Sequence, residues 1–459
     1  MIKGSVGQAR RGSDGLDASR NTIILGGGVT GLAAGLTSGL PVFERESFPG
    51  GICASYYLRP GGTERLLDAP ADGDAYRFEH GGGHWIFGGH PDVLALLETL
   101  TPVERIARRS SVFFPDEQRY VGFPLQHNLG QLAPALAQRA LEELLTERGQ
   151  AAQTMSQWLD ERFGPTLGEC FFHPFHAAYT AGLWQTIAPQ DGYKTPLDRG
   201  QVLRGAFGQA APVGYNVDFL YPRDGLDALM RALAAKVDLR TGRELLRIDT
   251  ARRELLFADG ERLPFDRLLA TLPLNRLTAL ADIDVGEPSE PYTSVLVLNI
   301  GAERGPRCPD DHWLYLPRTR AGFHRVGFYS HVAEHFLPAA ARGRRSHVGL
   351  YVERSYPGGA RPSADEQGAY AAAVVAELQD WGFIGEAQAV DASWVDVAYT
   401  WHRPGSRWVE RAIAALAGHG IRVAGRYARW HFQGITDSLR DGLLAGQALK
   451  LAASAPPAQ

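Results

Sequence analysis

Cysteine is scarce in this chain. The three that occur, Cys53, Cys170 and Cys308, lie far apart and have no CxxC spacing. An odd, scattered set of this kind predicts neither a disulfide framework nor a zinc knuckle. Free cysteines suit a reducing compartment, so we expect a cytoplasmic protein.

Long apolar runs are also missing. The longest, such as residues 295–298, fall far below the ~18 consecutive apolar residues that indicate a membrane span. Residues 1–20 are rich in Gly, Arg and Ser and lack the apolar stretch of a signal peptide, so they are predicted to form a flexible tail. No membrane span is therefore expected.

Lysine is also rare, since only four of the 47 basic residues are lysines. With 51 acidic residues, the net charge is −4. No stretch arranges basic and aromatic residues into a stripe that could follow a phosphate backbone, so nucleic acid is not a predicted partner. The rest of the composition is that of a globular protein, with 44% hydrophobic residues. At 459 residues the chain exceeds one hydrophobic core, which predicts two domains or one discontinuous pair.

The first ordered segment is predicted to be a strand, a glycine turn and a helix. Residues 22–25 form a short apolar run, and small residues typical of a closely packed helix follow the turn. Gly26 permits the tight turn, Gly28 lets backbone amides approach a pyrophosphate, and Gly31 lets the helix pack closely. A second strand then ends in Glu44, at the spacing expected for a ribose ligand. These features in this order predict dinucleotide binding.

NAD and FAD share that fingerprint, and two further motifs favour FAD. Arg45 is followed by Gly50 and Gly51, a second glycine turn that resembles the extended FAD motif of glutathione-reductase-type flavoproteins. A strand and a helix start near the other end resemble the C-terminal flavin motif of those proteins, at Gly425, Arg426 and Asp437. A helix N-terminus stabilises the negative charge that reduced flavin carries. FAD is therefore the predicted cofactor.

The middle of the chain is predicted to supply a separate substrate domain. Helical periodicity predicts a mostly helical insertion, at residues 132–150, 153–163 and 170–184. Alternating apolar residues predict an antiparallel sheet, at residues 294–300, 324–330 and 347–353. The predicted fold class is α/β, a glutathione-reductase-type FAD-binding Rossmann domain with a discontinuous substrate domain. Its predicted segments are a tail (1–20), three parts of the FAD-binding domain (21–126, 206–290 and 396–452), the helical insertion (127–205), the antiparallel-sheet domain (291–395) and a second tail (453–459).

Several short motifs have counterparts in one group of flavoproteins. Residues 82–87, Gly-Gly-His-Trp-Ile-Phe, resemble a flavin-contacting Gly-Pro-His-Ile-Phe segment, and residues 266–273 resemble a characteristic crossing of the chain out of the sheet. With the glycine motifs, they make the chain similar to the amine-oxidase and protoporphyrinogen-oxidase-like group, and most similar to the UDP-galactopyranose mutase family. The resemblance implies that His84 lies beside the flavin and that Leu245 belongs to the adenine-side strand.

Four other residues have counterparts among those that hold the mutases' substrate. Tyr179 and Trp184 lie in a stretch similar to the family's Tyr-Thr-x-x-x-Trp, whose aromatic rings hold the nucleotide. Arg204, with Tyr215 eleven residues beyond it, resembles the spacing of a diphosphate-binding arginine and a substrate-binding tyrosine. Each residue also has a structural alternative, because an arginine often forms an ion pair and an aromatic ring often belongs to the core.

The resemblance further implies that Arg325 is the second diphosphate arginine and that Tyr399 contacts phosphate. It implies an enzyme that isomerises a nucleotide-activated sugar between pyranose and furanose rings, through an adduct with reduced-flavin N5. No separate NAD(P)H-binding domain is apparent, so an external reductant is a predicted partner besides the small-molecule substrate. Two alternatives stay open: a net oxidoreductase, such as an amine oxidase, desaturase or sugar-modifying dehydrogenase, and a non-catalytic FAD-binding subunit.

One motif points to different chemistry. His331, Glu334 and His335 match the HxxEH spelling of certain zinc proteases. The segment follows a predicted strand, has Pro338 nearby and lacks an evident third ligand, so no metal site is predicted.

Overall fold

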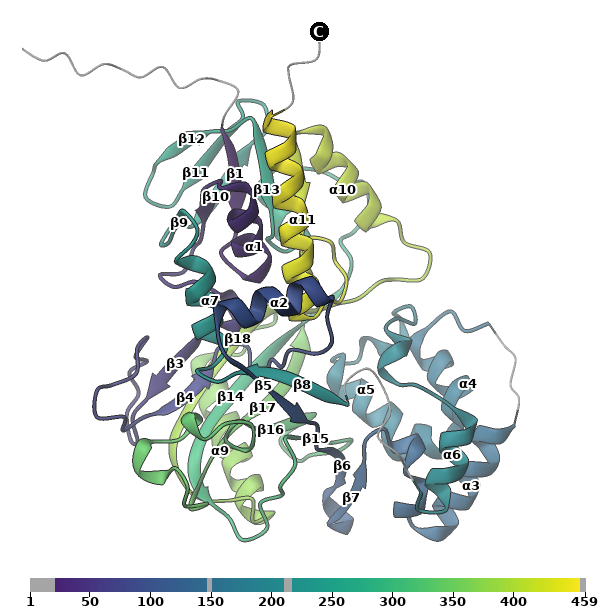
Figure 1. The fold of residues 1–459 in the computed structure, drawn as a ribbon. Coiled ribbons are helices and arrows are strands. Elements are labelled where there is room, and N and C mark those ends of the chain that lie inside the picture. Colours follow the sequence, from purple (N-terminus) through teal and green to yellow (C-terminus); the bar gives the residue numbers. More distant parts are fainter. Residues whose placement is uncertain (1–20, 147–150, 210–216, 455–459) are drawn as a thin grey trace, which may run out of the picture.

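The computed structural model describes residues 21–146, 151–209 and 217–454 (Figure 1). The predicted tail at 1–20 and residues 455–459 lie outside the described residues. A nucleotide-binding unit lies above a large antiparallel sheet in this view, and a helical lobe lies beside that sheet (Figure 1).

A five-stranded parallel sheet forms the centre of the nucleotide-binding unit. All four neighbouring pairs are parallel, as a Rossmann-type domain requires. The strands, in sheet order, are β19 (Ile421–Val423), β13 (Arg267–Ala270), β1 (Thr22–Leu25), β2 (Val42–Phe43) and β9 (Leu239–Arg240). Each is a short, largely apolar run, because helices or a second sheet cover both faces of the sheet.

Helices from the two ends of the chain pack against each other on this sheet. α1 (Val29–Ser38) follows the glycine turn, and α11 (Ile435–Ser454) corresponds to the predicted closing helix. A Cβ added at Gly442 would overlap the backbone of Thr30 in α1, so the two helices approach each other at glycine. The unit also contains α2 (Pro91–Leu100), α7 (Leu226–Ala234), α8 (Leu274–Leu280) and α10 (Trp408–Gly418).

Three smaller sheets flank this unit. A three-stranded antiparallel sheet packs its apolar residues against the parallel sheet. Its strands are β10 (Leu245–Asp249), β11 (Glu254–Phe257) and β12 (Arg262–Pro264). Two antiparallel pairs connect the two large units, β3 (Ser55–Leu58) with β4 (Tyr76–Glu79), and β5 (Val103–Ala107) with β8 (Asp218–Pro222).

The large second sheet has seven strands and is antiparallel except where β15 meets β6. In sheet order they are β18 (Ile384–Thr400), β14 (Tyr292–Arg304), β17 (His347–Pro357), β16 (Arg325–Phe328), β15 (Trp313–Tyr315), β6 (Ser110–Phe114) and β7 (Arg119–Gly122). Helix α9 (Ala364–Asp380) covers one face through Tyr370, Val374 and Leu378, which join the apolar core of the sheet.

One strand of this sheet crosses a predicted segment boundary, and two others lie in a segment assigned to a different domain. β18 runs without interruption through the predicted boundary at residue 395. β6 and β7 fall in the segment assigned to the FAD-binding domain, yet they pair with the seven-stranded sheet through β15. The pairing of β6 with β15 joins residues about 200 positions apart, which local sequence patterns do not specify.

The helical lobe contains α3 (Pro134–Leu145), α4 (Met155–Leu167), α5 (His173–Tyr179) and α6 (Arg199–Ala206). Thr154 and Gln157 cap α4 reciprocally, and Gly164, with a φ of 75°, kinks it before Pro165. The helix predicted at 170–184 is shorter in the structure, because Ala181 (φ 51°) and Gly182 (φ 87°) adopt left-handed conformations that end α5.

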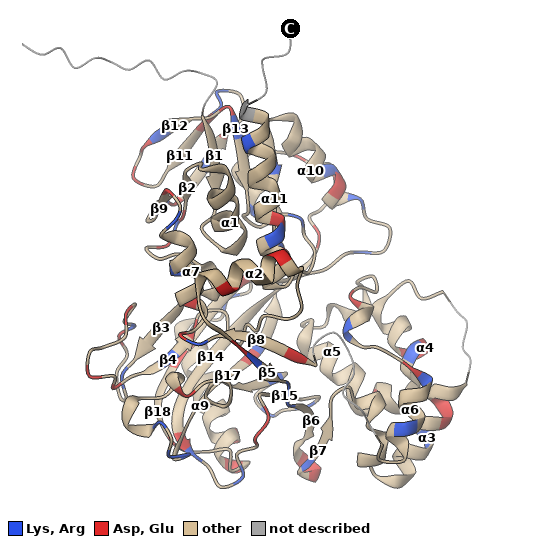
Figure 2. Cartoon of the chain, viewed as in Figure 1, with Lys and Arg blue, Asp and Glu red and all other residues tan. Residues whose placement is uncertain are grey.

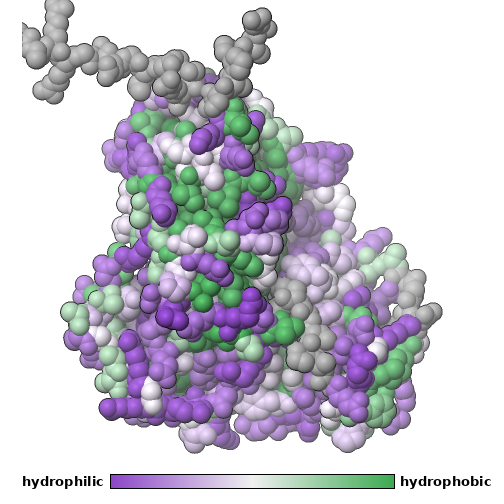
Figure 3. All heavy atoms as spheres, viewed as in Figure 1, coloured by the Kyte–Doolittle hydropathy of each residue, from purple (hydrophilic) through white to green (hydrophobic). Residues whose placement is uncertain are grey.

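The surface carries both charge signs. Lysine and arginine are interspersed with aspartate and glutamate along the described elements (Figure 2). Hydrophilic residues cover much of the face seen in Figure 3, while apolar residues gather around α1 and α2. No helix in the described part of the chain is long and apolar enough to cross a membrane.

Candidate active site

A cavity of about 630 Å³ connects the nucleotide-binding unit with the helical lobe. Gly28 and Glu44 line it at one end, and Trp158, Phe172 and Tyr179 line it at the other. A volume of this size is typical of a site for a small molecule or cofactor. Most of the surface between the two ends is aromatic or apolar.

The glycine turns lie at the first end and have the conformations that the motifs predict. Gly26 has a φ of 101° and Gly50 a φ of 102°, both in the left-handed region that favours glycine. The amide of Gly50 donates to the carbonyl of Gly27 at 2.9 Å, so the two glycine turns are joined. A Cβ added at Gly31 would overlap the carbonyl oxygen of Gly26, whereas one added at Gly28 would meet nothing within 4 Å. Gly31 is therefore required for packing, and Gly28 leaves open space in the cavity.

Glu44 follows strand β2 and organises the same region. One carboxylate oxygen accepts the amide of Gly27 at 2.6 Å, and the other accepts the amide of Glu46 at 2.9 Å. Each oxygen keeps a second lone pair, which a ribose hydroxyl can use.

The start of α11 lies at the same cavity and is the second helix N-terminus to do so. Gly434, Ile435, Asp437 and Ser438 line the cavity beside it. Gly28, the N-cap of α1, has no side chain to accept the first amides of that helix, so they stay available for an anion. The two helix starts, the open glycine turn and Glu44 fit an FAD with its pyrophosphate at α1 and its flavin toward α11.

Arg426 and His84 line the cavity next to this end. The guanidinium of Arg426 donates to the carbonyl of Ala398 at 2.9 Å and lies 4.5 Å from the ring centroid of Phe432. Burial lowers the pKa of His84 to about 4, so its imidazole is neutral and contacts the carbonyl of Gly82 at 3.2 Å. Both line the cavity, and their contact with the cofactor stays a prediction.

A half-buried arginine, Arg325, lies at the other end of the cavity. The register of β16 and β17 places Arg325 directly opposite Glu353. One guanidinium nitrogen of Arg325 lies 2.9 Å from the Glu353 carboxylate and donates to the hydroxyl of Tyr399 at 2.9 Å. Burial raises the pKa of the Glu353 carboxyl, and Arg325 opposes that rise. Glu353 and Tyr399 thus hold the Arg325 guanidinium in place at the cavity wall.

Aromatic rings complete this wall. The ring centroid of Tyr179 lies 4.7 Å from that of Tyr399 and 5.4 Å from that of Trp401, and both pairs are edge-to-face. Phe175 stacks on its other side at 5.7 Å. Burial raises the pKa of the Tyr179 hydroxyl well above its ordinary value, so the phenol stays protonated. The structure thus brings Tyr179, Arg325 and Tyr399 together, as the sequence predicts.

Other predicted site residues lie elsewhere. Trp184 is outside the cavity lining and stacks on His173 at 5.1 Å, and Arg204 is exposed on α6. Arg45 pairs with Glu46 at the surface, and Leu245 packs at the edge of the three-stranded sheet. Tyr215 lies outside the described residues. Spacing along the chain identified these positions, but it does not determine which way a helical side chain points.

Sequence reasoning missed one charged pair in the cavity. Lys194 and Asp191 line it and form an ion pair at 2.6 Å, and the Lys194 ammonium lies 3.3 Å from the ring centroid of Phe432. Burial lowers the pKa of Lys194 to about 8. The available signal was the rarity of lysine in this chain combined with its position ten residues after Trp184.

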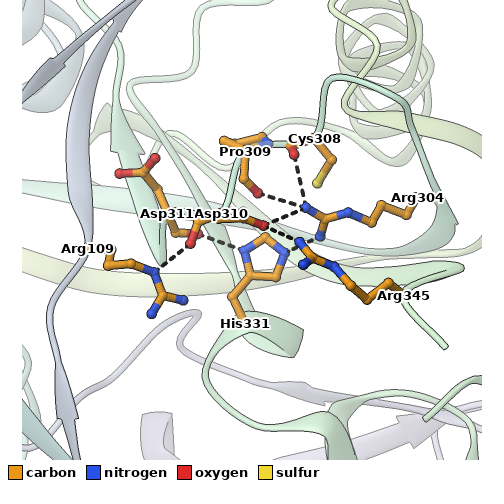
Figure 4. Close-up of polar contacts among 8 residues, drawn as sticks. All are labelled: Arg109, Arg304, Cys308, Pro309, Asp310, Asp311, His331 and Arg345. Atoms are coloured by element: carbon orange, nitrogen blue, oxygen red, sulfur yellow. Dashed lines mark hydrogen bonds and ion pairs between the residues drawn. The ribbon is translucent and has the colours of Figure 1, made fainter. Parts of the chain in front are cut away.

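The HxxEH segment is not a helix in the structure. His331 and His335 lie in two separate 3-10 turns. The ring nitrogens of His331 contact the Asp311 carbonyl and the Arg304 guanidinium, both at 2.7 Å (Figure 4). Arg304 also binds the Asp310 carboxylate, so this histidine belongs to a polar cluster that holds the loop after β14 (Figure 4).

Comparison with solved structures finds the same fold in several flavoproteins. Reduced UDP-galactopyranose mutase superposes with a TM-score of 0.80 at 19% identity, over 95% of this chain and 96% of that one. A protein from Exiguobacterium sp. 255-15, to which protoporphyrinogen oxidase activity has been ascribed, has a TM-score of 0.67 at 16% identity over 94% and 98%. Wild-type putrescine oxidase bound to putrescine has a TM-score of 0.55 at 15% identity over 94% and 98%. At these low identities, the superpositions establish a shared fold and nothing further.

Comparison with known sequences identifies the family. No curated protein matches the chain. The profile of flavin-containing amine oxidoreductases matches residues 36–449, which include the seven-stranded sheet, the helical lobe and the nucleotide-binding unit after α1. With the Rossmann-type domain and the FAD-compatible cavity, this match shows that the chain belongs to the flavin-containing amine oxidoreductase family and uses FAD.

Proposed function

We propose that this protein isomerises a nucleotide-activated sugar between pyranose and furanose rings. The observation that carries the proposal is the half-buried guanidinium of Arg325 at the wall of a cavity that Arg426 and Lys194 also line. The fold shared with reduced UDP-galactopyranose mutase supports the same reading.

The charges in the cavity favour an anionic substrate. Glu353 pairs with Arg325 and Asp191 with Lys194, so these two pairs nearly cancel. Among the described residues no carboxylate pairs with Arg426, whose recorded partners are a backbone carbonyl and aromatic rings. Among these five residues the three cations exceed the two carboxylates, so this part of the cavity favours a phosphorylated substrate over a protonated amine. The two other carboxylates of the lining, Glu44 and Asp437, belong to the cofactor end.

Each residue then has a physical task. Arg325 holds the diphosphate, and because Glu353 and Tyr399 fix its position before binding, little reorganisation is needed as charge develops on the leaving group. Tyr179 provides an aromatic wall and excludes water from the reacting bond. Gly28, Glu44 and the start of α11 would hold FAD, which in its reduced form would supply nucleophilic chemistry with no net change of oxidation state.

A net oxidation on the same scaffold is the second candidate. The rings of Tyr179, Tyr399 and Trp401 form an aromatic group of the kind that can bind an amine, and Glu353 places a carboxyl beside it. This alternative predicts reduction of FAD by the substrate in stoichiometric amount. The isomerase predicts no net change in flavin oxidation state.

One experiment separates the two. The FAD-loaded protein is reduced anaerobically with dithionite, as a substitute for an external reductant, and supplied with UDP, GDP and TDP sugars. A furanose isomer that forms only with reduced enzyme supports the proposal. Absence of any isomer, together with bleaching of oxidised FAD by an amine or an unactivated sugar, would refute it and favour the oxidation.

A further inference from the structure

Lys194 is a half-buried cation in the cavity lining, and the proposed function assigns it no task. It lies in the helical insertion, at the end of the 3-10 turn Gly192–Lys194, and its side chain is 24% exposed. Lys194 and Arg325 both line the cavity, yet they come from different units of the fold. Lys194 is therefore a cation that the helical insertion contributes to the cavity lined by Arg325.

The surroundings of Lys194 satisfy it only in part. Its ammonium has three N–H donors, and among the described residues one hydrogen bond is recorded, to Asp191 at 2.6 Å. The Phe432 ring offers only its face, at 3.3 Å from the ammonium. The charged groups that act on Lys194 are Asp191 on its own loop, Arg426 on the C-terminal segment and Arg325 on β16. Burial and the two arginines act against the charged form, and Asp191 alone favours it.

A diphosphate clamp at Arg325 lacks the partner that spacing predicted, because Arg204 is exposed and outside the cavity lining. Lys194 is inside that lining and close enough to Arg325 and Arg426 for both to lower its pKa. A diphosphate carries several anionic oxygens, which an ammonium with two unused donors can bind.

Building on the proposed function, we propose that Lys194 is the second cation of the substrate clamp and binds a phosphate group of the ligand opposite Arg325. Asp191 occupies the ammonium until the ligand arrives, and the phosphate then takes over part of its hydrogen bonding. Lys194 thus determines that the cavity prefers ligands with phosphate over uncharged ligands of the same shape.

Acid–base behaviour gives the inference a distinctive consequence. Because the pKa of Lys194 is lowered to about 8, the ammonium is charged at pH 7.5 and largely neutral at pH 9.5. A phosphate ester has its second pKa near about 6, so the ligand keeps its charge over that range. Affinity for a nucleoside diphosphate should therefore fall as the pH rises through 8, and arginine at this position should remove that dependence.

The test is calorimetric titration of the FAD-loaded protein with UDP, GDP and TDP, and with the matching nucleosides. We expect Lys194→Met to weaken the tightest of the three diphosphates by at least about tenfold and to leave the nucleoside unchanged, and Lys194→Arg to retain binding within about threefold at both pH values. Lys236→Met, which removes an exposed lysine outside the cavity lining, is the matched control.

Three outcomes would overturn the inference. They are diphosphate binding by Lys194→Met equal to that of wild type, release of FAD from this variant, and failure of the wild type to bind any of the three diphosphates. If Lys194→Met does not fold, Asp191→Asn decides at pH 6.5, because removing the competing carboxylate should tighten diphosphate binding, and unchanged or weaker binding refutes the inference. Weakened binding without any sugar isomer would retain this inference and refute the proposed function. If Arg325→Met weakens diphosphate binding and Lys194→Met does not, the inference about Lys194 is refuted and the proposed function is retained.

Discussion

Two glycines of the first turn should respond in opposite ways to the same added methyl group. Gly28 has a φ of −76° and a ψ of −175°, which any residue adopts, and a Cβ there would meet nothing within 4 Å. Gly28→Ala should therefore leave the stability of the FAD-free protein unchanged or raise it by up to about 1 kcal/mol. A Cβ at Gly31 would overlap the carbonyl oxygen of Gly26. Gly31→Ala should move α1 away from the turn and cost about 1–3 kcal/mol.

Gly28→Ala should weaken FAD binding even though it does not destabilise the protein. The methyl group of Gly28→Ala projects into the cavity, where backbone amides must approach the pyrophosphate. Loss of one or two hydrogen bonds to a charged group, at about 1.5–3 kcal/mol each, corresponds to a dissociation constant raised by at least about tenfold. Flavin fluorescence titration measures this affinity, and thermal melting of the FAD-free protein measures stability. If Gly28→Ala bound FAD as tightly as wild type, the cofactor phosphates would not lie at this turn.

Three further predictions concern the substrate end and the helical lobe. Arg325→Met should destabilise the protein by up to about 3–5 kcal/mol, because it leaves the Glu353 carboxyl without its partner. Burial raises the pKa of Glu353, so the loss should be larger at pH 8, where the carboxyl must ionise in the folded protein, than at pH 5. Urea unfolding of Arg325→Met with and without Glu353→Gln tests this, and failure of Glu353→Gln to restore stability would contradict it. Arg204→Ala should change stability by less than about 0.5 kcal/mol and diphosphate affinity by less than about twofold, which calorimetry would disprove by showing a tenfold loss. Thr154→Ala removes the cap of α4 and should cost about 1 kcal/mol in thermal unfolding, and an unchanged melting temperature would argue against the capping box.

The cofactor half of the site could be predicted because its signal is local. Gly26, Gly28 and Gly31 lie within six residues, and a backbone motif of this kind gives the same turn wherever it occurs. Glu44 follows from the length of one strand–helix–strand unit. The parallel sheet and the closing helix were predictable for the same reason.

The substrate half was predicted only in part, because its residues come from separate segments. Arg325 and Tyr399 both line the cavity, and their roles stay predictions. Arg325 lies on β16, within a strand that the sequence predicted, whereas β18, which carries Tyr399, was not predicted. Arg204 and Trp184 were not, because a helix rotates successive side chains by about 100° and a small change of register turns a residue away from the cavity. Lys194 lies in a loop, where neither periodicity nor spacing gives a direction.

This division is consistent with a fold shared by a mutase and an oxidase that are each 15–19% identical to this chain. The cofactor end depends on glycine turns and helix starts, so few side chains are needed to preserve it. The substrate end is made by side chains of the helical insertion and of β16, β17 and β18, each of which can change without disturbing the FAD cradle. In this chain, those segments supply two cations, Lys194 and Arg325, each paired with a carboxylate, Asp191 and Glu353. The fold alone is compatible with either reaction, so the proposed roles of Arg325 and Lys194 are what the substrate-binding experiments must decide.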